Sequence, residues 1–210
     1  DPDKLLQLNP YMELATKLGK VLCQMVEGPL SSVEIGVFGE ASKFDSHPIA
    51  SASMVGLLCR HHAVPVNQIN ALHLARRQGI NVTKVSSADS KDYLSLVRIT
   101  AQSSEQTVIL EGAIFDESRP RLVKINGYEI ESPLEGHLLI TKHADEPGVV
   151  GKIGEALGKE DINISRMQVG VAEDTQLAIA ILDISGSLSS AALENISKIG
   201  AVEKVLQVLL

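Results

Sequence analysis

The stretch HLLITKHADEPGVVGKIGEALGKEDINISRMQVG, His137 to Gly170, decides the fold of the last third of this chain. An apolar run, a Pro-Gly turn, a run with helical spacing of apolar residues and a second β-rich run predict strand, turn, helix and strand. Gly148, Gly151 and Gly154 fall in the predicted helix, where each costs up to about 1 kcal/mol relative to alanine. Such glycines indicate that a small anionic ligand or another subunit approaches the helix backbone closely.

The residues after Gly170 continue with the same kinds of element. QLAIAILDIS, 176–185, predicts a strand that is buried on both faces. Ser189 can cap a helix that Gly200 ends, and AVEKVLQVLL, 201–210, predicts a closing strand. The order from His137 to Leu210 is therefore βαββαβ, a split pair of βαβ units.

The second strand of this region has a break in its alternation. Ile162 and Ile164 fall on one face, whereas Met167, Val169 and Val171 fall on the other. A bulge near Ser165 would bring both sets to the same face, and we therefore predict one there.

Composition limits the function classes. The length of 210 residues suggests one or two domains, and 44% hydrophobic with 21% charged residues is typical of a soluble globular protein. A net charge of -7 argues against a nucleic-acid partner. No apolar run approaches the length of a membrane span, and the first ten residues do not resemble a signal peptide. Cys23 and Cys59 have neither metal-type nor redox spacing, so we expect buried free thiols and a cytoplasmic protein.

The first two thirds of the chain form a separate unit in this interpretation. Helices are expected from Asn9 to Gly28, from Ser46 through Cys59 and from Asn67 to Gln78, with β-rich runs around and after them. Asn126-Gly127 between two such runs predicts a type I′ hairpin turn. SPLEG, 132–136, then separates a first domain, 1–132, from a second, 137–210.

Two motifs resemble known families. HADEPGVVGKIG, 143–154, followed by INI, 162–164, resembles the first half of an ACT domain, a ferredoxin-like module that binds amino acids. VNQINALHLARRQGI, 66–80, is similar to a segment of the intervening, or allosteric-substrate-binding, domain of type 1 D-3-phosphoglycerate dehydrogenases, and PYMELATKLGKVLCQM, 10–25, resembles the helix that begins that domain. The resemblance implies an α+β chain, with a mixed α/β intervening domain followed by a βαββαβ ACT domain.

A catalytic centre is not evident from the sequence. A dinucleotide site needs a G-x-G-x-x-G loop between a strand and a helix, and the glycines at 148, 151 and 154 have the wrong spacing. Adjacent His61 and His62 point in different directions on a helix, so no metal site is predicted. We expect no catalytic residue and no cofactor in this segment. The resemblance implies that it is the regulatory part of an NAD-dependent enzyme whose catalytic half lies elsewhere.

The resemblance also implies a ligand, L-serine or a similar small amino acid. Its carboxylate would meet the free N–H groups at the helix N-terminus, and its ammonium group would face Asp145, which we also expect to cap the helix. Asn163 would reach the ligand from a neighbouring subunit, so a homodimer is the minimum unit. The ligand-binding residues implied in this way are His143, Asp145, Gly148, Val149, Val150 and Asn163.

A second site is implied in the first domain, where Arg121 and Lys124 would bind a phosphate-type anion. An ordinary solvated edge strand explains the same residues, because Lys and Arg deter edge-to-edge aggregation. The sequence also departs from the family near Pro133, where a second basic residue is expected.

Two other functions remain open. A freestanding amino-acid sensor would have the same ACT motif. The regulatory part of another enzyme of amino-acid metabolism, such as serine dehydratase, would share both modules, but that enzyme needs a cysteine cluster for iron and sulfur, which Cys23 and Cys59 cannot form.

Overall fold

The computed structural model describes residues 2–59, 65–90, 92–116, 118–171 and 175–210. The chain divides into two compact units, Asp1–Asn126 and Gly127–Leu210, and the architecture is α+β, as predicted. The segment 132–136, proposed from the sequence as a linker, lies inside the second unit. No helix among the described residues is long and apolar enough to cross a membrane.

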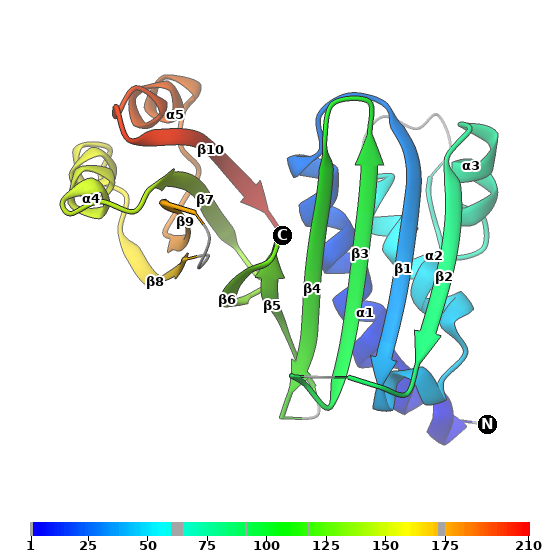
Figure 1. The fold of residues 1–210 in the computed structure, drawn as a ribbon. Coiled ribbons are helices and arrows are strands. Elements are labelled where there is room, and N and C mark those ends of the chain that lie inside the picture. Colours follow the sequence, from blue (N-terminus) through cyan, green and yellow to red (C-terminus); the bar gives the residue numbers. More distant parts are fainter. Residues whose placement is uncertain (1, 60–64, 91, 117, 172–174) are drawn as a thin grey trace. The chain divides into compact units, whose positions relative to one another are not determined.

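The first unit places helices against a mixed sheet (Figure 1). Its helices are α1 (Pro2–Met25), the short 3-10 helix η1 (Glu40–Lys43), α2 (Ser46–Leu57) and α3 (Ala71–Arg77). Its strands are β1 (Leu30–Gly39), β2 (Asn81–Ser87), β3 (Ser95–Ser103), β4 (Thr107–Phe115) and β5 (Arg119–Ile125), in the spatial order β2-β1-β3-β4-β5. β1 and β2 are parallel, whereas the other neighbours are antiparallel.

α1 starts earlier than the sequence predicts, because Pro10 lies inside the helix rather than at its first turn. The helix packs on α2 and on β3, β4 and β5. Leu14, Leu18 and Leu22, spaced four residues apart along α1, are fully buried, so this apolar stripe of the helix faces the core. The turn Asn126-Gly127 has positive φ at both residues, 49° and 86°, as a type I′ turn requires, and it leads into β6 (Tyr128–Pro133).

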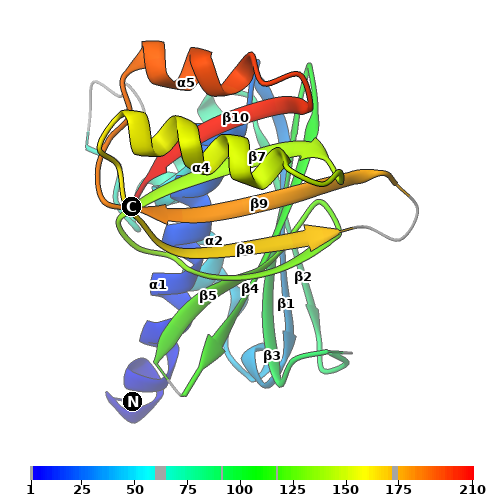
Figure 2. The same cartoon turned by 90° about the vertical axis from the view of Figure 1, so that its left-hand side faces the viewer.

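The second unit has the predicted βαββαβ order: β7 (His137–Ala144), α4 (Val149–Lys159), β8 (Ile164–Val171), β9 (Leu177–Ile184), α5 (Ser190–Ser197) and β10 (Val202–Leu209). The strands form an antiparallel sheet in the order β10-β7-β9-β8. α4 and α5 cover one face, with α5 beside β10 and α4 nearer to β8 (Figure 2). This is the ferredoxin-like arrangement.

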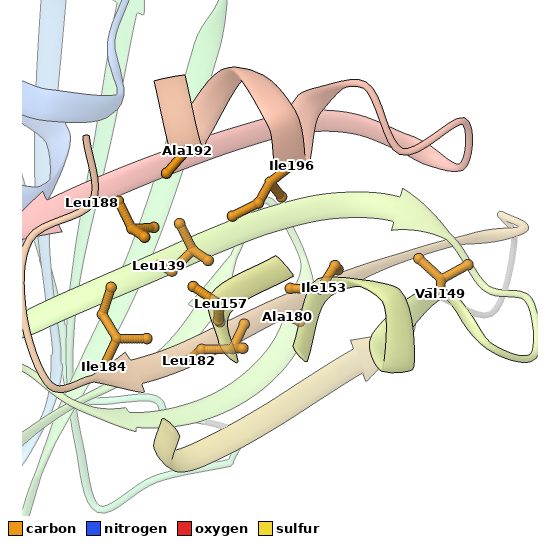
Figure 3. Close-up of a cluster of buried hydrophobic side chains, with 10 residues drawn as sticks. All are labelled: Leu139, Val149, Ile153, Leu157, Ala180, Leu182, Ile184, Leu188, Ala192 and Ile196. Carbon is orange, nitrogen blue, oxygen red and sulfur yellow. The ribbon is translucent and has the colours of Figure 1, made fainter. Parts of the chain in front are cut away.

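The core of this unit lies between the two helices and the sheet (Figure 3). Leu139 of β7 and Ala180, Leu182 and Ile184 of β9 point toward Ile153 and Leu157 of α4 and toward Ala192 and Ile196 of α5. The predicted bulge is confirmed, because the pairing of β8 with β9 shifts between Ile164 and Arg166. Ile164 and Met167 therefore both pack against this core.

β6 lies against β8 and β9 within the second unit. Gly170 of β8 makes this contact possible, because a Cβ atom there would lie closer than 3.0 Å to the backbone carbonyl oxygen of Glu129. Tyr128 adds a hydrogen-bond contact between its hydroxyl and that of Thr175, at 3.2 Å. The requirement for glycine at 170 is therefore steric and structural.

Candidate functional site

The loop between β7 and α4 is a type II turn that opens the helix. Gly148 has φ 89° and ψ -12°, the backbone angles of the third residue of such a turn, and Pro147 occupies the position before it. The N–H of Val149 points to the carbonyl oxygen of Glu146 at 3.5 Å. The prediction that Asp145 caps the helix is therefore wrong: the N-cap residue is Gly148, and no side chain bonds there.

The first turn of α4 leaves backbone donors available. The N–H of Lys152 donates to the carbonyl of Gly148 at 3.1 Å, the first bond of the helical ladder. The N–H groups before it have no acceptor four residues earlier within the helix. Val149 is buried at 3% exposure and anchors the turn on the core, whereas Val150 is 40% exposed. The N-terminus of α4 is therefore anchored to the core on its inner side and exposed to solvent on its outer side.

His143, at the end of β7, is 2% exposed. Its Nδ1 lies 3.0 Å from the carbonyl oxygen of Ala144, and because a carbonyl only accepts, Nδ1 carries the proton of this bond. In the neutral ring Nε2 is then an acceptor, and this buried atom has no partner among the described residues. An unmade bond of this kind costs about 1–3 kcal/mol.

Thr141 is a residue that the sequence reasoning did not single out. It lies two positions before His143, on the same face of β7 as Leu139, and is fully buried. Its hydroxyl also lacks a partner among the described residues. The sequence signal for Thr141 is a hydroxyl-bearing residue at a position of the apolar strand where a core residue is expected.

Asp145 lies beside the start of β9. Its N–H donates to the carbonyl oxygen of Gln176 at 2.9 Å, which fixes the backbone. The side chain is exposed, and no hydrogen bond or ion pair to the carboxylate is found within the described part of the chain. A negative charge therefore stands free next to the open end of α4.

Asn163 lies at the opposite end of the same sheet. Its N–H donates to the Oγ of Ser185 and its carbonyl oxygen accepts from the N–H of Ser185, each bond 3.0 Å long, and its side chain is exposed. His143 pairs with Ala178 of β9, whereas Ile164 pairs with Ile184, six residues further along. At about 3.3 Å per residue this is roughly 20 Å. A single chain therefore brings His143, Asp145 and the α4 N-terminus together but leaves Asn163 apart.

The glycines of α4 are open on their outer side. A Cβ atom added at Gly151, Gly154 or Gly158 would meet no atom of the described residues within 4 Å. Lys152 and Lys159 line a groove of about 390 Å³ with Asn195 of α5, and none of the predicted ligand residues lines it. At about 100° per residue the glycines lie roughly 120° around the helix from the groove side. They therefore lie on the side of α4 away from α5.

An exposed apolar surface accompanies the glycines. Val169 and Val171 are 42% and 49% exposed, and by alternation they share the helix-bearing face with Met167. β8 forms one edge of the sheet. Val150 adds to the exposed apolar area at the start of α4. The edge that carries the glycines is thus also apolar.

Arg121 and Lys124 in the first unit lie on one face because of a bulge. The pairing of β4 with β5 shifts so that Glu111 opposes Lys124 and Ala113 opposes Arg121. Val123 is the extra residue, and without it the two basic side chains would lie on opposite faces. Lys124 Nζ forms an ion pair with Asp92 at 3.0 Å, and the Arg121 guanidinium lies 5.5 Å from the centre of the Phe115 ring.

The second unit has the fold and the order of elements of an ACT domain, and the ACT domain model matches residues 137–201. The model of the D-3-phosphoglycerate dehydrogenase intervening domain matches residues 7–126, more than half of the chain. The chain therefore belongs to the D-3-phosphoglycerate dehydrogenase family and consists of an intervening domain and an ACT domain.

Several proteins named D-3-phosphoglycerate dehydrogenase align with both units of this chain. A D-3-phosphoglycerate dehydrogenase of Methanocaldococcus jannaschii is 34% identical over 203 residues, 97% of this chain and 38% of the relative. The enzyme of Synechocystis sp. is 30% identical over 96% of the chain and 36% of its own length. That of Bacillus subtilis is 28% identical over 97% of the chain and 39% of its own length. The chain thus spans less than two fifths of these relatives.

Proposed function

We propose that this chain is the regulatory segment of an NAD-dependent D-3-phosphoglycerate dehydrogenase and that its ACT domain binds L-serine between two copies of the chain. The relatives are named D-3-phosphoglycerate dehydrogenase, which supports this activity for the parent enzyme. The match to the ACT domain model supports an amino-acid ligand. The observation that carries the proposal is the buried Nε2 of His143, an acceptor without a partner at the open N-terminus of α4.

A second copy explains how Asn163 joins the site. Suppose that two β8 edges pair antiparallel about a two-fold axis at Met167. A residue that precedes Met167 by a given number of positions then stands opposite the residue that follows Met167 by the same number in the other copy. Asn163 of the second copy then stands opposite Val171. Val171 pairs with Ala178, which pairs with His143, so Asn163 of the second copy comes to the end of the sheet that carries His143 and Asp145.

The same pairing uses the surface that one chain leaves open. The α4 glycines lie on the side of the helix away from α5 and so face a neighbour placed beyond β8. Val169 and Val171, half exposed in one chain, would be buried there, and burial of apolar area stabilises such a contact. The glycines would let the two α4 helices approach closely, which offsets their unfavourable helix propensity.

The proposed site has one group for each polar part of serine. The carboxylate accepts from the N–H groups of Gly148 and Val150, and from that of Val149 in place of its 3.5 Å contact with the Glu146 carbonyl; the helix dipole contributes about 0.3–1 kcal/mol there. The ammonium group faces Asp145. The hydroxyl donates to Nε2 of His143, and Asn163 of the second copy completes the site. L-Alanine lacks the hydroxyl and would leave Nε2 unpartnered, at about 1–3 kcal/mol.

Isothermal titration tests this arrangement. L-Serine should bind at least about fivefold more tightly than L-alanine, and Asp145→Ala and Asn163→Ala should each weaken serine binding about tenfold or more. Glu146→Ala is the matched control, because it removes an exposed carboxylate from the same turn and should leave binding unchanged. Asp145→Ala should also leave the free energy of unfolding unchanged, since the type II turn and not this carboxylate opens α4.

Mixing the two binding-deficient variants tests whether the site is shared. A heterodimer of Asp145→Ala with Asn163→Ala has one site that carries both substitutions and one intact site. The mixture should therefore regain serine binding that neither variant has alone. If the mixture does not regain binding although the variants exchange subunits, the shared site is wrong; if both single variants bind serine like the unchanged chain, the residues are wrong.

A second ligand is proposed for the first unit, a phosphate-type anion at Arg121 and Lys124. The bulge at Val123 supports it, because the bulge turns both cations to the face opposite α1. Gly112, adjacent to Glu111, faces Leu14 and Leu18 of α1 and fixes that orientation. An anion bound at Lys124 would replace Asp92 as its partner.

A further inference from the structure

The two cysteines of the chain meet in the first unit. The Sγ atoms of Cys23 and Cys59 lie 2.7 Å apart, although the residues are 36 positions apart in sequence. They are not joined in a disulfide. Cys23, on α1, is 8% exposed, whereas Cys59, two residues after α2, is exposed. The sequence expectation of two buried thiols is therefore wrong for Cys59.

A backbone contact between α1 and α2 brings the thiols together. A Cβ atom on Gly19 would lie closer than 3.0 Å to the carbonyl oxygen of Ser53, and one on Gly56 would overlap the carbonyl oxygen of Thr16 in the same way. The two helices therefore touch through their glycines. Cys23 lies four residues after Gly19 and Cys59 lies three residues after Gly56, so each thiol follows the crossing point by about one turn.

We propose that Cys23 and Cys59 are a redox-active pair that closes to a disulfide by exchange with a small-molecule disulfide such as oxidised glutathione. A disulfide bond is about 2.05 Å long, so the sulfur atoms must approach by only about 0.7 Å. The bond would join α1 to the end of α2 where the helices already touch. This inference concerns the first unit and does not depend on the serine site.

The order of the two exchange steps follows from exposure. Cys59 loses its proton to solvent, and its thiolate attacks one sulfur of the small disulfide, which forms a mixed disulfide and releases one small thiolate. The thiolate of Cys23, after losing its own proton, attacks the sulfur of Cys59 and releases the second small thiolate. Two protein thiols are oxidised, and one small disulfide is reduced to two thiols. Cys23 cannot begin the reaction because it is buried.

Formation of the disulfide stabilises the first unit because it restricts the unfolded state of the chain. The new bond closes a loop of 36 residues that contains β1 and α2. Such a loop restricts the unfolded state, and for a unit of this size the melting temperature should rise by roughly 10 °C. A dithiol reductant returns the pair to thiols. The first unit thus acquires a stability that depends on the surrounding thiol–disulfide balance.

Mass spectrometry of the folded chain without reductant tests the pair. After incubation with oxidised glutathione, the chain should lose two hydrogen atoms, and digestion should yield one cross-linked peptide containing Cys23 and Cys59. Cys23→Ser should stop at a glutathione adduct on Cys59, and Cys59→Ser should stay unmodified. Accumulation of the adduct on the unchanged chain, or no reaction under conditions in which Cys23→Ser is modified, would overturn the proposal.

A thermal measurement provides a second readout. The oxidised chain should melt roughly 10 °C higher than the reduced chain, and dithiothreitol should reverse the shift. Cys59→Ser should show one melting temperature with and without oxidant. A disulfide that forms without raising the melting temperature would mean that the bond distorts the α1–α2 contact, which contradicts the geometry proposed here.

Discussion

Replacing Gly151 and Gly154 with alanine should stabilise one chain and weaken the pairing of two. Among the described residues of one chain, a Cβ at either position meets nothing within 4 Å, and both residues lie in the regular part of α4. Each substitution therefore gains the helix propensity of alanine, about 0.8–1 kcal/mol, or about 2 kcal/mol for both. In the 84-residue second unit, Gly127–Leu210, this raises the melting temperature by roughly 10 °C.

The effect on the dimer has the opposite sign. Two methyl groups on each chain fill the space in which the proposed neighbour lies, so four are added at the interface, and overpacking of this kind costs about 1–3 kcal/mol. Sedimentation equilibrium should show a dimer dissociation constant that is higher by at least about fivefold, and serine affinity should fall with it. Chemical unfolding at concentrations below that constant measures the gain in the single chain.

Gly200→Ala is the control, because its added Cβ also lies more than 4 Å from every described neighbour but is outside α4. It should leave dimerisation unchanged. A double variant that is more stable and still forms dimers as tightly as the unchanged chain would refute the idea that the glycines face a second copy.

Two further predictions concern the separate units. Gly170→Ala should lower the free energy of unfolding of the second unit by about 1–3 kcal/mol, because a backbone oxygen of Glu129 cannot rotate away from the new methyl group; urea titration measures this, and Gly186→Ala, which meets only a side-chain atom at 3.6 Å, should be near neutral. Inorganic phosphate should raise the melting temperature of the first unit, and Arg121→Ala should abolish that rise; equal stabilisation of both proteins would indicate general salting-out.

Local signals explain what could be predicted from the sequence. The bulge at Ser165 follows from a break in alternation within ten residues, and the turn at Asn126-Gly127 follows from two residues that accept positive φ. The order of elements from His137 to Leu210 follows from the periodicity of apolar residues together with local turn and capping residues. None of these features depends on a distant part of the chain.

The start of α4 shows where local signals compete. Asp145 before an apolar helical run fits a capping residue, and Pro147-Gly148 in the same loop fits a type II turn. Both rules apply to the same four residues, and only one conformation can form. The left-handed φ of Gly148 shows that the turn prevails, because it lets Val149 enter the core while Asp145 pairs its backbone with Gln176.

The pairing of Cys23 with Cys59 could not be predicted, because it depends on a contact between two helices. Residues 36 positions apart carry no spacing signal. Gly19 and Gly56 are visible in the sequence, but a glycine in a helix indicates only that something approaches it closely. Which segment approaches becomes known only when α1 and α2 are packed.

Comparison of the helix glycines within this chain supports the proposed dimer. At Gly19 and Gly56 the space that a side chain would fill is occupied by the backbone of the partner helix, so the low helix propensity of glycine is offset inside one chain. At Gly151, Gly154 and Gly158 the same space holds no atom of the residues that the structure describes, so no contact with those residues offsets that loss. The physical reason for these glycines must then lie outside the chain. A second copy across β8 supplies it, and the same copy carries Asn163 to the end of the sheet where His143 has no partner.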